Sequence, residues 1–326
     1  MKILDRYGRR ISYLRLSLTD RCNLRCHYCM PADGVEKLHH NEILSLEELH
    51  MVAEEAVLLG IDKIRLTGGE PLLRKGLIPF CERLASLRGL KELVLTTNGT
   101  LLPEMAAPLR KAGVKRLNIS LDSLKAERFS AITRGGDLWR VLAGIKAAMA
   151  AGFPPPKINM VMMAGINDDE VLDFARLTVE HSFTVRFIEY MPTLKEVDWQ
   201  KRCIPGTELL ERIGRAYRLI PLVSTESAGP AKNFKIEGGA GSIGIITPIS
   251  GHFCDSCNRI RVSSRGMAHG CLFSGGSIDL KPALRSGKDG YLRRSLLEIV
   301  SGKPMGHRLR EEHDDRSPFA MSGIGG

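Results

Sequence analysis

Three cysteines near the N-terminus have a spacing that suits a metal centre. Cys22, Cys26 and Cys29 form the pattern C-x3-C-x2-C, so three thiolates on one short segment can face a single centre. Thiolates are soft ligands that select zinc or iron-sulfur clusters, and structural zinc normally takes four protein ligands. A cubane held by three thiolates leaves one iron open to a substrate or cofactor, which is a catalytic arrangement. The alternative is a structural zinc with His27 as fourth ligand, although a histidine between two cysteines chelates awkwardly.

A second group of three cysteines lies far along the chain. Cys254, Cys257 and Cys271 form the pattern C-x2-C-x13-C, again with three thiolates rather than four. Zinc is a stronger alternative here, because His252 or His269 could complete a tetrahedron and a C-x2-C knuckle is common in zinc proteins. The spacing therefore predicts a second metal centre and leaves its metal open.

Basic residues follow the second cysteine group. Arg259 and Arg261 are two apart on a predicted strand and so share a face, and Arg265 follows in the turn. Guanidinium groups make forked hydrogen bonds to phosphate, so these arginines could form an anion clamp. The alternative is a solvated basic strand. The 47 Lys and Arg against 37 Asp and Glu, a formal charge of +10, favour nucleic acid, an acidic surface or a polyphosphate ligand.

Composition narrows the class of protein. The 326 residues suffice for one large domain and a smaller one. Eight cysteines in a chain without a signal-like start indicate thiols or metal ligands rather than disulfides. No run approaches the roughly 18 apolar residues of a membrane span, so we expect a cytoplasmic protein without a membrane partner. Cys81, within a helical pattern, and Cys203, in a loop, are predicted to lie outside the site.

Short β-rich runs alternate with helical patterns through the first two thirds of the chain. The strands are predicted at residues 14–18, 64–67, 93–96, 116–120, 158–163 and 185–188. The helices between them are predicted at residues 46–59, 77–87, 105–112, 138–151 and 169–181. Repeated β-then-α units indicate parallel strands with crossover helices. Six units are too few for an eightfold barrel, which leaves an incomplete barrel or an open doubly wound sheet.

The pattern changes after about Met191. One helix is predicted at residues 207–217, and β-like runs at 243–247 and 260–263. We therefore predict a domain over residues 1–195 and a second, smaller one over 196–326. Segments 224–230 and 237–242, rich in small residues, are predicted to be mobile loops.

The first cysteine pattern resembles the radical S-adenosylmethionine (SAM) superfamily, whose loop has this spacing and an aromatic residue before the last cysteine, here Tyr28. The segment Gly68-Gly69-Glu70-Pro71 resembles a further motif of that superfamily, although alone it would indicate only a tight turn. The resemblance implies that a [4Fe-4S] cluster on the first triplet binds SAM and cleaves it reductively to methionine and a 5'-deoxyadenosyl radical. It also implies that four residues contact SAM: Tyr28, Gly69, Ser120 and Met191. For Met191 the alternative is ordinary core packing.

The second cysteine pattern, the arginine pair and a Gly-Gly C-terminus together resemble the GTP cyclase family of molybdenum cofactor biosynthesis. This resemblance implies a second [4Fe-4S] cluster whose open iron faces the purine of GTP, and a tail at Gly325-Gly326 that enters the active site. It implies catalytic roles for Arg15, Arg259 and Arg261. The implied GTP contacts are Arg15, Lys63, Arg65, Thr96, Lys157, Arg259, Ile260 and Arg261.

The family resemblance implies an α/β fold, an incomplete parallel (β/α)6 barrel with a smaller C-terminal α+β domain. The implied reaction converts GTP to (8S)-3',8-cyclo-7,8-dihydroguanosine 5'-triphosphate, with hand-over to cyclic pyranopterin monophosphate synthase, a possible homodimer and no nucleic-acid partner. One alternative is a radical SAM peptide maturase with an auxiliary cluster, although such proteins often carry more C-terminal cysteines. Another is a basic zinc-containing RNA-binding module. The aromatic content of 6% gives such a module few side chains on which bases could stack.

Overall fold

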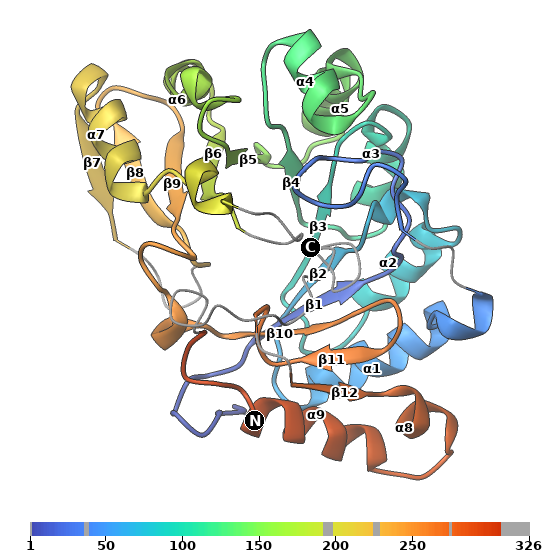
Figure 1. Ribbon diagram of the computed structural model, residues 1–326. Helices are drawn as coiled ribbons and strands as arrows, with labels where there is room; N and C mark the ends of the chain where they lie inside the picture. Colours follow the sequence, from blue (N-terminus) through green and yellow to red (C-terminus); the bar gives the residue numbers. More distant parts are fainter. Residues whose placement is uncertain (1, 36–38, 192–197, 224–228, 274–275, 308–326) are drawn as a thin grey trace.

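Six parallel strands follow one another in chain order across the centre of the sheet (Figure 1). The computed structural model describes residues 2–35, 39–191, 198–223, 229–273 and 276–307. The central strands are β1 (Tyr13–Ser17), β2 (Lys63–Thr67), β3 (Glu92–Thr97), β4 (Arg116–Ser120), β5 (Lys157–Met162) and β6 (Thr184–Glu189). Each end lies within one residue of its prediction. The order has no reversal, so the incomplete barrel is confirmed and the doubly wound sheet is excluded.

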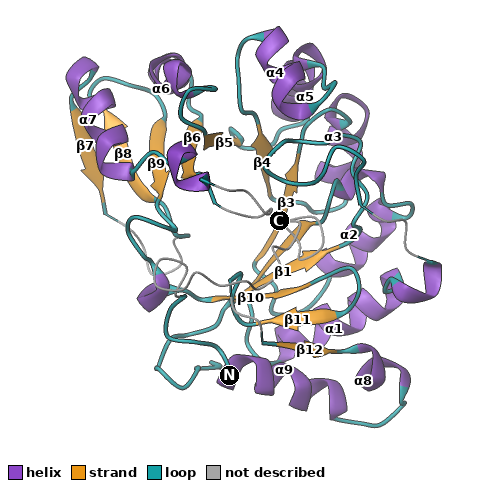
Figure 2. Ribbon diagram, in the orientation of Figure 1, coloured by secondary structure: helices purple, strands orange, loops and turns teal. Residues whose placement is uncertain are grey.

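The crossover helices cover the outer face of the curved sheet, and its inner face points away from them (Figure 2). They are α1 (Leu46–Leu58), α2 (Leu77–Ala85), α3 (Leu102–Lys111), α4 (Ala126–Thr133), α5 (Leu138–Ala150) and α6 (Val171–Glu180). Short 3-10 turns are η1 (His40–Glu42), η2 (Pro71–Leu73) and η3 (Asp168–Glu170). Helix α1 begins with a capping box, because Ser45 Oγ accepts from Glu48 N at 3.1 Å and Glu48 Oε2 accepts from Ser45 N at 2.8 Å. The sequence analysis did not predict α4, whose eight residues bury only Phe129, Ile132 and Thr133.

The C-terminal residues extend the sheet at both ends. Their elements are η4 (Trp199–Arg202), α7 (Gly206–Ala216), β7 (Leu219–Leu222), β8 (Lys232–Ile236), β9 (Ser242–Ile246), η5 (Cys254–Ser256), β10 (Arg259–Val262), β11 (Met267–His269), β12 (Ser277–Asp279), α8 (Lys281–Arg285) and α9 (Tyr291–Ser301). Strand β9 pairs in parallel with β6, and β10 pairs in parallel with β1. The predicted domain boundary at 195/196 lies outside the described residues and stays a prediction, as does the mobility of segment 224–228.

The hydrophobic core lies between the sheet and the helices. Successive side chains of a strand point to opposite faces, and in β5 Ile158, Met160 and Met162 are buried in contact with the core or its edge. Lys157 and Asn159 alternate with them and face the opposite side. Parallel strands covered on both faces are normally apolar throughout, so Lys157 and Asn159 indicate that the inner face is kept for a ligand.

Candidate active site

A cavity of about 610 Å³ opens on the inner face of the sheet, and both cysteine triplets line it. The residues predicted for the site that line it are Arg15, Cys22, Cys26, Tyr28, Cys29, Lys63, Arg65, Gly69, Thr96, Ser120, Lys157, Met191, Cys254, Cys257, Arg259, Arg261 and Cys271. The side chain of Ile260 is not among them, because it alternates with the two arginines and packs in the core. Arg265 is exposed and also lies outside the cavity. Residues from ten strands and from several loops thus line one cavity, although many of these segments are distant in sequence.

The first cysteine triplet follows β1 on a loop held by short-range hydrogen bonds. Cys29 N donates to Cys26 O at 2.9 Å, and Cys22 Sγ accepts from Leu24 N at 3.4 Å. Burial, Asp122 and the neighbouring thiols raise the pKa of Cys26 well above its ordinary value. A thiolate at this position therefore needs a cation beside it, which is what an iron-sulfur cluster supplies to three cysteines.

The paired glycines explain how the second strand supports this loop. A Cβ on Gly68, whose φ is +147°, would lie 2.4 Å from Thr19 O, and one on Gly69 would lie 2.3 Å from Arg21 O. Gly69 N donates to Thr19 O at 2.7 Å, and Glu70 N donates to Arg21 O at 2.8 Å. The glycines are required because backbone meets backbone here. The Gly-Gly segment thus positions the first cysteine loop as well as lining the cavity.

Substituting Gly69 with alanine is expected to lower the free energy of unfolding by about 1 to 3 kcal/mol, since the new methyl group overlaps backbone that has no room to move. The same change should weaken iron binding at the first triplet, because the displaced segment carries Arg21 and then Cys22. Urea unfolding and iron content after anaerobic reconstitution measure the two effects. Gly214→Ala, at a helical glycine with open space around it, is the matched control. Equal stability of the two variants would contradict this account.

Glu70 completes the link between the ends of β2 and β3. Its fully buried carboxylate accepts from Thr97 Oγ1 at 2.8 Å, Asn98 N at 2.7 Å and Leu72 N at 3.1 Å. Burial raises the pKa of Glu70 to about 7, although these hydrogen bonds favour the ionised form. Asn98 Nδ2 in turn lies 3.8 Å from Cys22 Sγ, so this carboxylate indirectly positions the first cysteine.

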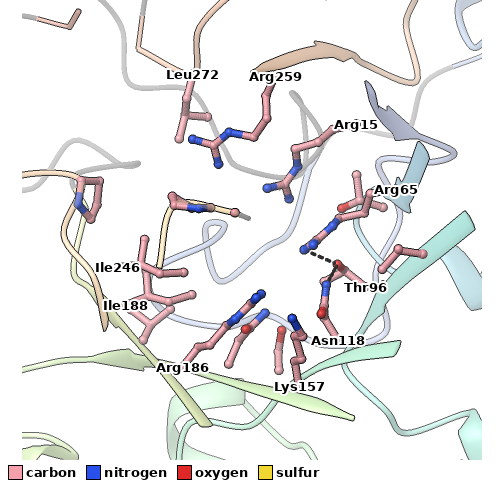
Figure 3. Close-up of a pocket in the computed structure, with 18 of the residues that line it drawn as sticks. Arg15, Arg65, Thr96, Asn118, Lys157, Arg186, Ile188, Ile246, Arg259 and Leu272 are labelled. Atoms are coloured by element: carbon pink, nitrogen blue, oxygen red, sulfur yellow. Dashed lines mark hydrogen bonds between the residues drawn. The ribbon is translucent and has the colours of Figure 1, made fainter. Parts of the chain in front are cut away.

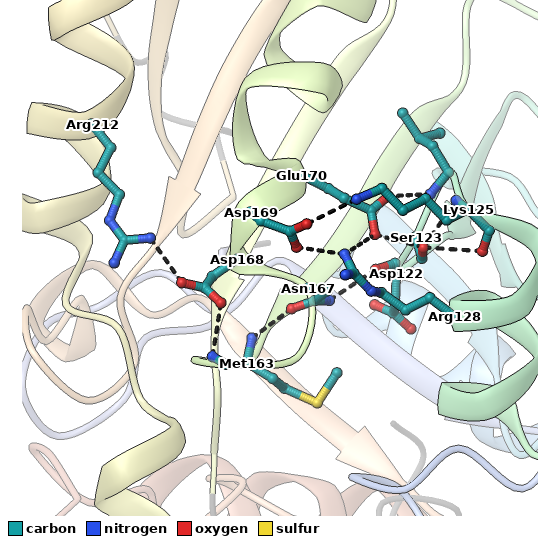
Figure 4. Close-up of polar contacts among 12 residues, drawn as sticks. Asp122, Ser123, Lys125, Arg128, Met163, Asn167, Asp168, Asp169, Glu170 and Arg212 are labelled. Carbon is teal, nitrogen blue, oxygen red and sulfur yellow. Dashed lines mark hydrogen bonds and ion pairs between the residues drawn. The ribbon is translucent and has the colours of Figure 1, made fainter.

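Tyr28, between the second and third cysteines, is linked through Asp122 to strands β4 and β5. Its hydroxyl donates to Asp122 Oδ2 at 2.7 Å, and Val161 N donates to Asp122 Oδ1 at 2.8 Å. Asn167 Nδ2 donates to Asp122 O at 2.8 Å, which holds the carboxylate's own backbone (Figure 4). Burial raises the pKa of Asp122 to about 6. Asp122 is therefore a residue that the sequence analysis missed and that orients the aromatic side chain of the cysteine loop.

The polar network beside Asp122 joins α4, η3 and α7 (Figure 4). Buried Glu170 accepts from Ser123 Oγ at 2.7 Å and pairs with Arg128 at 2.6 Å. Asp168 Oδ2 accepts from Arg212 Nη1 at 2.9 Å, which ties α7 to the start of α6. None of these groups lines the cavity, so the network supports the site and contributes no ligand.

The second cysteine triplet lies beside β1 because β10 pairs with it. Cys257 N donates to Cys254 O at 3.0 Å, and Cys257 Sγ accepts from Lys303 Nζ at 3.4 Å and lies 3.7 Å from Arg259 Nη2. Burial would raise the pKa of Cys257, but the charges of Arg259 and Lys303 lower it to about 6. The thiol of Cys257 thus has two cations beside it, whereas that of Cys26 in the first triplet has an acidic residue and other thiols.

The zinc alternatives can be compared with these positions. His27 is exposed and does not line the cavity, whereas the three cysteines around it do. In the described part of the chain, His252, Cys254 and His307 form a group whose ligand atoms all lie within 4.8 Å of one another. Cys257 and Cys271 are not part of that group, so it does not complete the C-x2-C-x13-C triplet as a tetrahedral zinc site.

Three arginines stand side by side across the floor of the cavity. Arg261 on β10 is in register with Arg15 on β1, and Arg15 is in register with Arg65 on β2. Adjacent strands lie about 4.8 Å apart, so these same-face guanidinium groups are neighbours. The side chains of Arg186 and Lys157 point into the same space from β6 and β5, opposite Arg15 and Arg65 (Figure 3).

Most of these cations have no carboxylate partner. No ion pair formed among the described residues includes Arg15, Arg65, Lys157, Arg186, Arg259 or Arg261. Four buried guanidinium nitrogens also lack a hydrogen-bond partner: Nε of Arg15, Arg65 and Arg186, and Nη1 of Arg261. Lys63 differs, because its Nζ pairs with Glu92 at 2.8 Å. Uncompensated buried charge is costly, so the cavity is built for a polyanion.

Burial and mutual repulsion lower the pKa values of the cations. The pKa of Arg15 falls well below its ordinary value through burial and the charges of Arg261 and Arg65. The pKa of Lys157 falls to about 7 through burial and the charges of Arg186 and Arg116. An anion bound in the cavity would restore these values, because it favours the charged form of each group.

Polar residues on the inner face were missed by the sequence analysis. Arg186, Asn118, Asn159 and Tyr13 all line the cavity from the central strands. The signal was present, because a charged or amide side chain inside a buried parallel strand costs free energy unless it serves a ligand. Arg186 within residues 184–189 is the clearest example.

The remaining predicted residues fall into three groups. Met191 and Ser120 line the cavity, each half-buried. Cys81 is buried in α2 and Cys203 follows η4, and neither lines the cavity. The tail at Gly325-Gly326 lies outside the described residues.

Family comparisons agree with the fold and the cysteine geometry. The family model described as the radical SAM superfamily matches residues 16–178, and the one described as Molybdenum Cofactor Synthesis C matches residues 183–309. The chain is thus a radical SAM protein with a second region typical of molybdenum cofactor synthesis.

Relatives match over the full length. The chain is 59% identical over 326 residues to the GTP 3',8-cyclase of Geobacter sulfurreducens, covering 100% of both chains. It is 48% identical over 323 residues to that of Moorella thermoacetica and 45% identical over 323 residues to that of Alkaliphilus oremlandii, covering 99% of each chain. The chain belongs to the GTP 3',8-cyclase family of radical SAM enzymes.

Solved structures share the fold at low sequence identity. SuiB of Streptococcus suis bound to S-adenosylmethionine has a TM-score of 0.61 at 16% identity, covering 92% of this chain and 68% of that one. The structure of native anSMEcpe with bound AdoMet has a TM-score of 0.58 at 17% identity, covering 88% of this chain and 82% of that one. At such identities the likeness concerns the fold alone. None of the helices in the described residues has both the length and the apolar character needed to cross a membrane.

Proposed function

We propose that this chain catalyses the SAM-dependent radical cyclisation of GTP to (8S)-3',8-cyclo-7,8-dihydroguanosine 5'-triphosphate, the first step of molybdenum cofactor biosynthesis. The observation that carries the proposal is that two three-cysteine groups and a set of uncompensated cations line one cavity. When bound, a [4Fe-4S] cluster on Cys22, Cys26 and Cys29 supplies the electron that cleaves SAM to a 5'-deoxyadenosyl radical. The reaction class follows from the family, and the roles of individual residues below are part of the proposal.

The residues around the first triplet would bind and orient SAM. Three thiols that line the cavity fit a cluster with one open position, and Asp122 holds the Tyr28 ring beside it through the 2.7 Å hydrogen bond. The backbone at Gly69 and the side chains of Ser120 and Met191 line the same end. A methionine and an aromatic ring offer apolar contact, while the strand ends offer backbone groups for the amino acid part of SAM.

The cations of the cavity would bind the triphosphate of GTP. Guanidinium groups make forked hydrogen bonds to phosphate, and several of them offset the charge of a triphosphate. We assign this role to the cations, hydroxyl and amide of the sheet floor: Lys63, Arg65, Thr96, Asn118, Lys157 and Arg186. Arg65 Nη1 donates to Thr96 Oγ1 at 3.3 Å, so this guanidinium is already oriented in the free protein (Figure 3).

Arg15, Arg259 and Arg261 would act closer to the reacting atoms. Arg259 Nη2 lies 3.7 Å from Cys257 Sγ, so these arginines border the second triplet, which would hold the cluster that contacts the purine. They fix the ribose and base relative to SAM, because a radical reaction needs near-attack geometry in a site closed to stray hydrogen donors. Ile188, Ile246 and Leu272 line the cavity and would exclude water (Figure 3).

The peptide maturase alternative is not favoured. The full-length relatives are named as GTP cyclases, and the SuiB likeness, at 16% identity, concerns the fold alone. An RNA-binding module without catalysis is likewise not favoured, because the chain belongs to a family of enzymes. The cavity's uncompensated cations account for part of the basic charge without a nucleic-acid partner.

The partners and location belong to the same proposal. We infer that the enzyme works in the cytoplasm, where reducing conditions keep its cysteines reduced and the six of the two triplets available as ligands. The product would pass to cyclic pyranopterin monophosphate synthase, and a homodimer is the proposed assembly.

Anaerobic turnover with SAM, dithionite and GTP tests the proposed function. We expect 5'-deoxyadenosine and the cyclised nucleotide in equal amounts, and no cyclised product when GTP is omitted. Metal analysis of the same sample should show iron without zinc. Zinc in place of iron, or 5'-deoxyadenosine formed with a peptide but never with GTP, would reject the proposal.

Binding of GTP at pH 8 is expected to take up protons, because Lys157 has a pKa of about 7 and is largely neutral at that pH in the free protein. A bound triphosphate favours the ammonium form, so GTP affinity should fall as pH rises above about 7. Calorimetric titration without reductant, in buffers of different ionisation enthalpy, measures the uptake.

Two variants control this measurement. Lys157→Met should abolish the proton uptake at pH 8, since it removes the titrating group. Lys146→Met should retain it, because Lys146 is an exposed lysine of α5 that does not line the cavity. Unchanged uptake in Lys157→Met would assign the proton to another group.

A further inference from the structure

Lys303 is a buried lysine placed directly behind the second cysteine triplet. It follows the end of α9, and only 2% of its surface is exposed. Its Nζ donates to Arg259 O at 2.9 Å, to Gly270 O at 2.5 Å and to Cys257 Sγ at 3.4 Å. An ammonium has three N–H donors, so each of them has a partner. Two partners are backbone groups, and the third is a cysteine predicted to bind a cluster.

These contacts bring together segments that carry different cysteines. Arg259 is two residues after Cys257, and Gly270 directly precedes Cys271. A Cβ on Gly270 would lie 3.1 Å from Lys303 Cα, so the glycine permits the lysine backbone to approach this closely. One ammonium therefore holds both halves of the C-x2-C-x13-C pattern at a fixed separation.

The charge of Lys303 is not balanced by a carboxylate. No ion pair within the described residues includes it, and its neighbours are two carbonyls and a sulfur. Arg9 offers a comparison, because it also contacts this region through Cys254 O at 2.7 Å and Pro304 O at 2.7 Å. Its Nε pairs with Asp5 at 2.6 Å, so its charge is compensated. A buried cation without an acidic partner costs several kcal/mol unless an anion lies beside it.

We infer that Lys303 is the counter-cation of the second iron-sulfur cluster, a positioning residue that sets the cluster's reduction potential through Cys257. This rests on the proposed function only in assigning a [4Fe-4S] cluster to the second triplet. A cluster held by three thiolates carries net negative charge in both oxidation states, and reduction adds one more. A cation at the sulfur stabilises the reduced state more than the oxidised state, so it raises the potential.

The test compares potentials in a protein that carries only the second cluster. In a Cys22→Ala, Cys26→Ala, Cys29→Ala background, redox titration followed by electron paramagnetic resonance reports the second cluster alone. Lys303→Met removes the charge and keeps the length of the side chain. We expect its reduction equilibrium constant to fall at least tenfold, a shift of 59 mV or more to negative potential for one electron. Lys303→Arg, which keeps the charge, should recover at least half of that shift.

Controls separate this role from general stability. Lys288→Met, at an exposed lysine before α9, should leave the potential unchanged. If Lys303→Met does not retain its cluster, Lys303→Gln, which keeps hydrogen-bond donors without charge, supplies the comparison. A neutral variant with the parent's potential would overturn the inference. A parent protein that binds zinc at the second triplet would instead overturn the proposed function, before any Lys303 variant is compared.

Discussion

Replacing Cys26 with alanine is expected to abolish release of 5'-deoxyadenosine from SAM and to remove about four of the about eight iron atoms bound per chain. Cys26 lines the cavity between two other thiols, and burial raises its pKa well above the ordinary value. Two remaining thiolates leave two irons without a protein ligand, so the first cluster has no stable site. The second triplet is untouched, because it is built on β10 and the residues around it.

Iron and sulfide analysis, with chromatography of the SAM products, measures both effects. Cys81→Ala is the matched control, since Cys81 is a buried thiol in α2 outside the cavity. It should bind iron and cleave SAM as the parent does, with at most a loss of stability from the missing sulfur. Release of 5'-deoxyadenosine by Cys26→Ala at the parent rate would show that the first triplet does not hold the catalytic cluster.

Replacing Arg261 with methionine is expected to lower GTP turnover by roughly 30- to 5000-fold while leaving uncoupled SAM cleavage near the parent rate. Arg261 is 6% exposed and stands in register with Arg15, with Nη1 buried and unpartnered. Removing one member of a buried charge pair costs about 2 to 5 kcal/mol, which gives the stated range. SAM cleavage is spared because it depends on the first triplet. Product formation and 5'-deoxyadenosine release, measured together, separate the two.

The same variant should be more stable than the parent when GTP is absent. Burial and the charge of Arg259 lower the pKa of Arg261 to about 10, so in the free protein this guanidinium is opposed by its surroundings. Its removal relieves that repulsion and raises the free energy of unfolding. Arg265→Met, at an exposed arginine outside the cavity, should change neither activity nor stability appreciably. Parallel loss of SAM cleavage and GTP turnover in Arg261→Met would contradict a role confined to GTP.

The other cations of the cavity floor likewise lower the stability of the ligand-free protein while they prepare it to bind an anion. Three guanidinium groups on neighbouring strands repel one another, and Lys157 loses part of its charge at neutral pH. The fold tolerates this because the outer face of the same strands packs against the helices, with Ile158 and Leu66 fully or almost fully buried. One face of each strand therefore supplies stability, and the other supplies a site that is complete only with an anion.

Much of the barrel could be predicted from local sequence. All six central strands end within one residue of prediction, because β-rich runs bounded by turns and followed by helical periodicity are local signals. Helix α4 was missed because eight residues show little periodicity, and β11 and β12 because three residues are too few. The C-terminal elements β7, β8, α8 and α9 were also not predicted. The cavity residue Arg186 was missed for a different reason, since only its place inside a strand indicates that it faces a cavity.

The two cysteine patterns, the superfamily and the parallel β/α order can be predicted from the amino-acid sequence, because spacing and periodicity act within short segments. That the two triplets share one cavity depends instead on the tertiary structure. That follows from the parallel pairing of β10 with β1, which places Arg261 beside Arg15 although they are far apart in the chain. The contact of Lys303 with Cys257 has the same origin, since it depends on where α9 packs and not on any pattern near either residue. Pairing between distant segments is set by the packing of the whole sheet, and no local signal carries it.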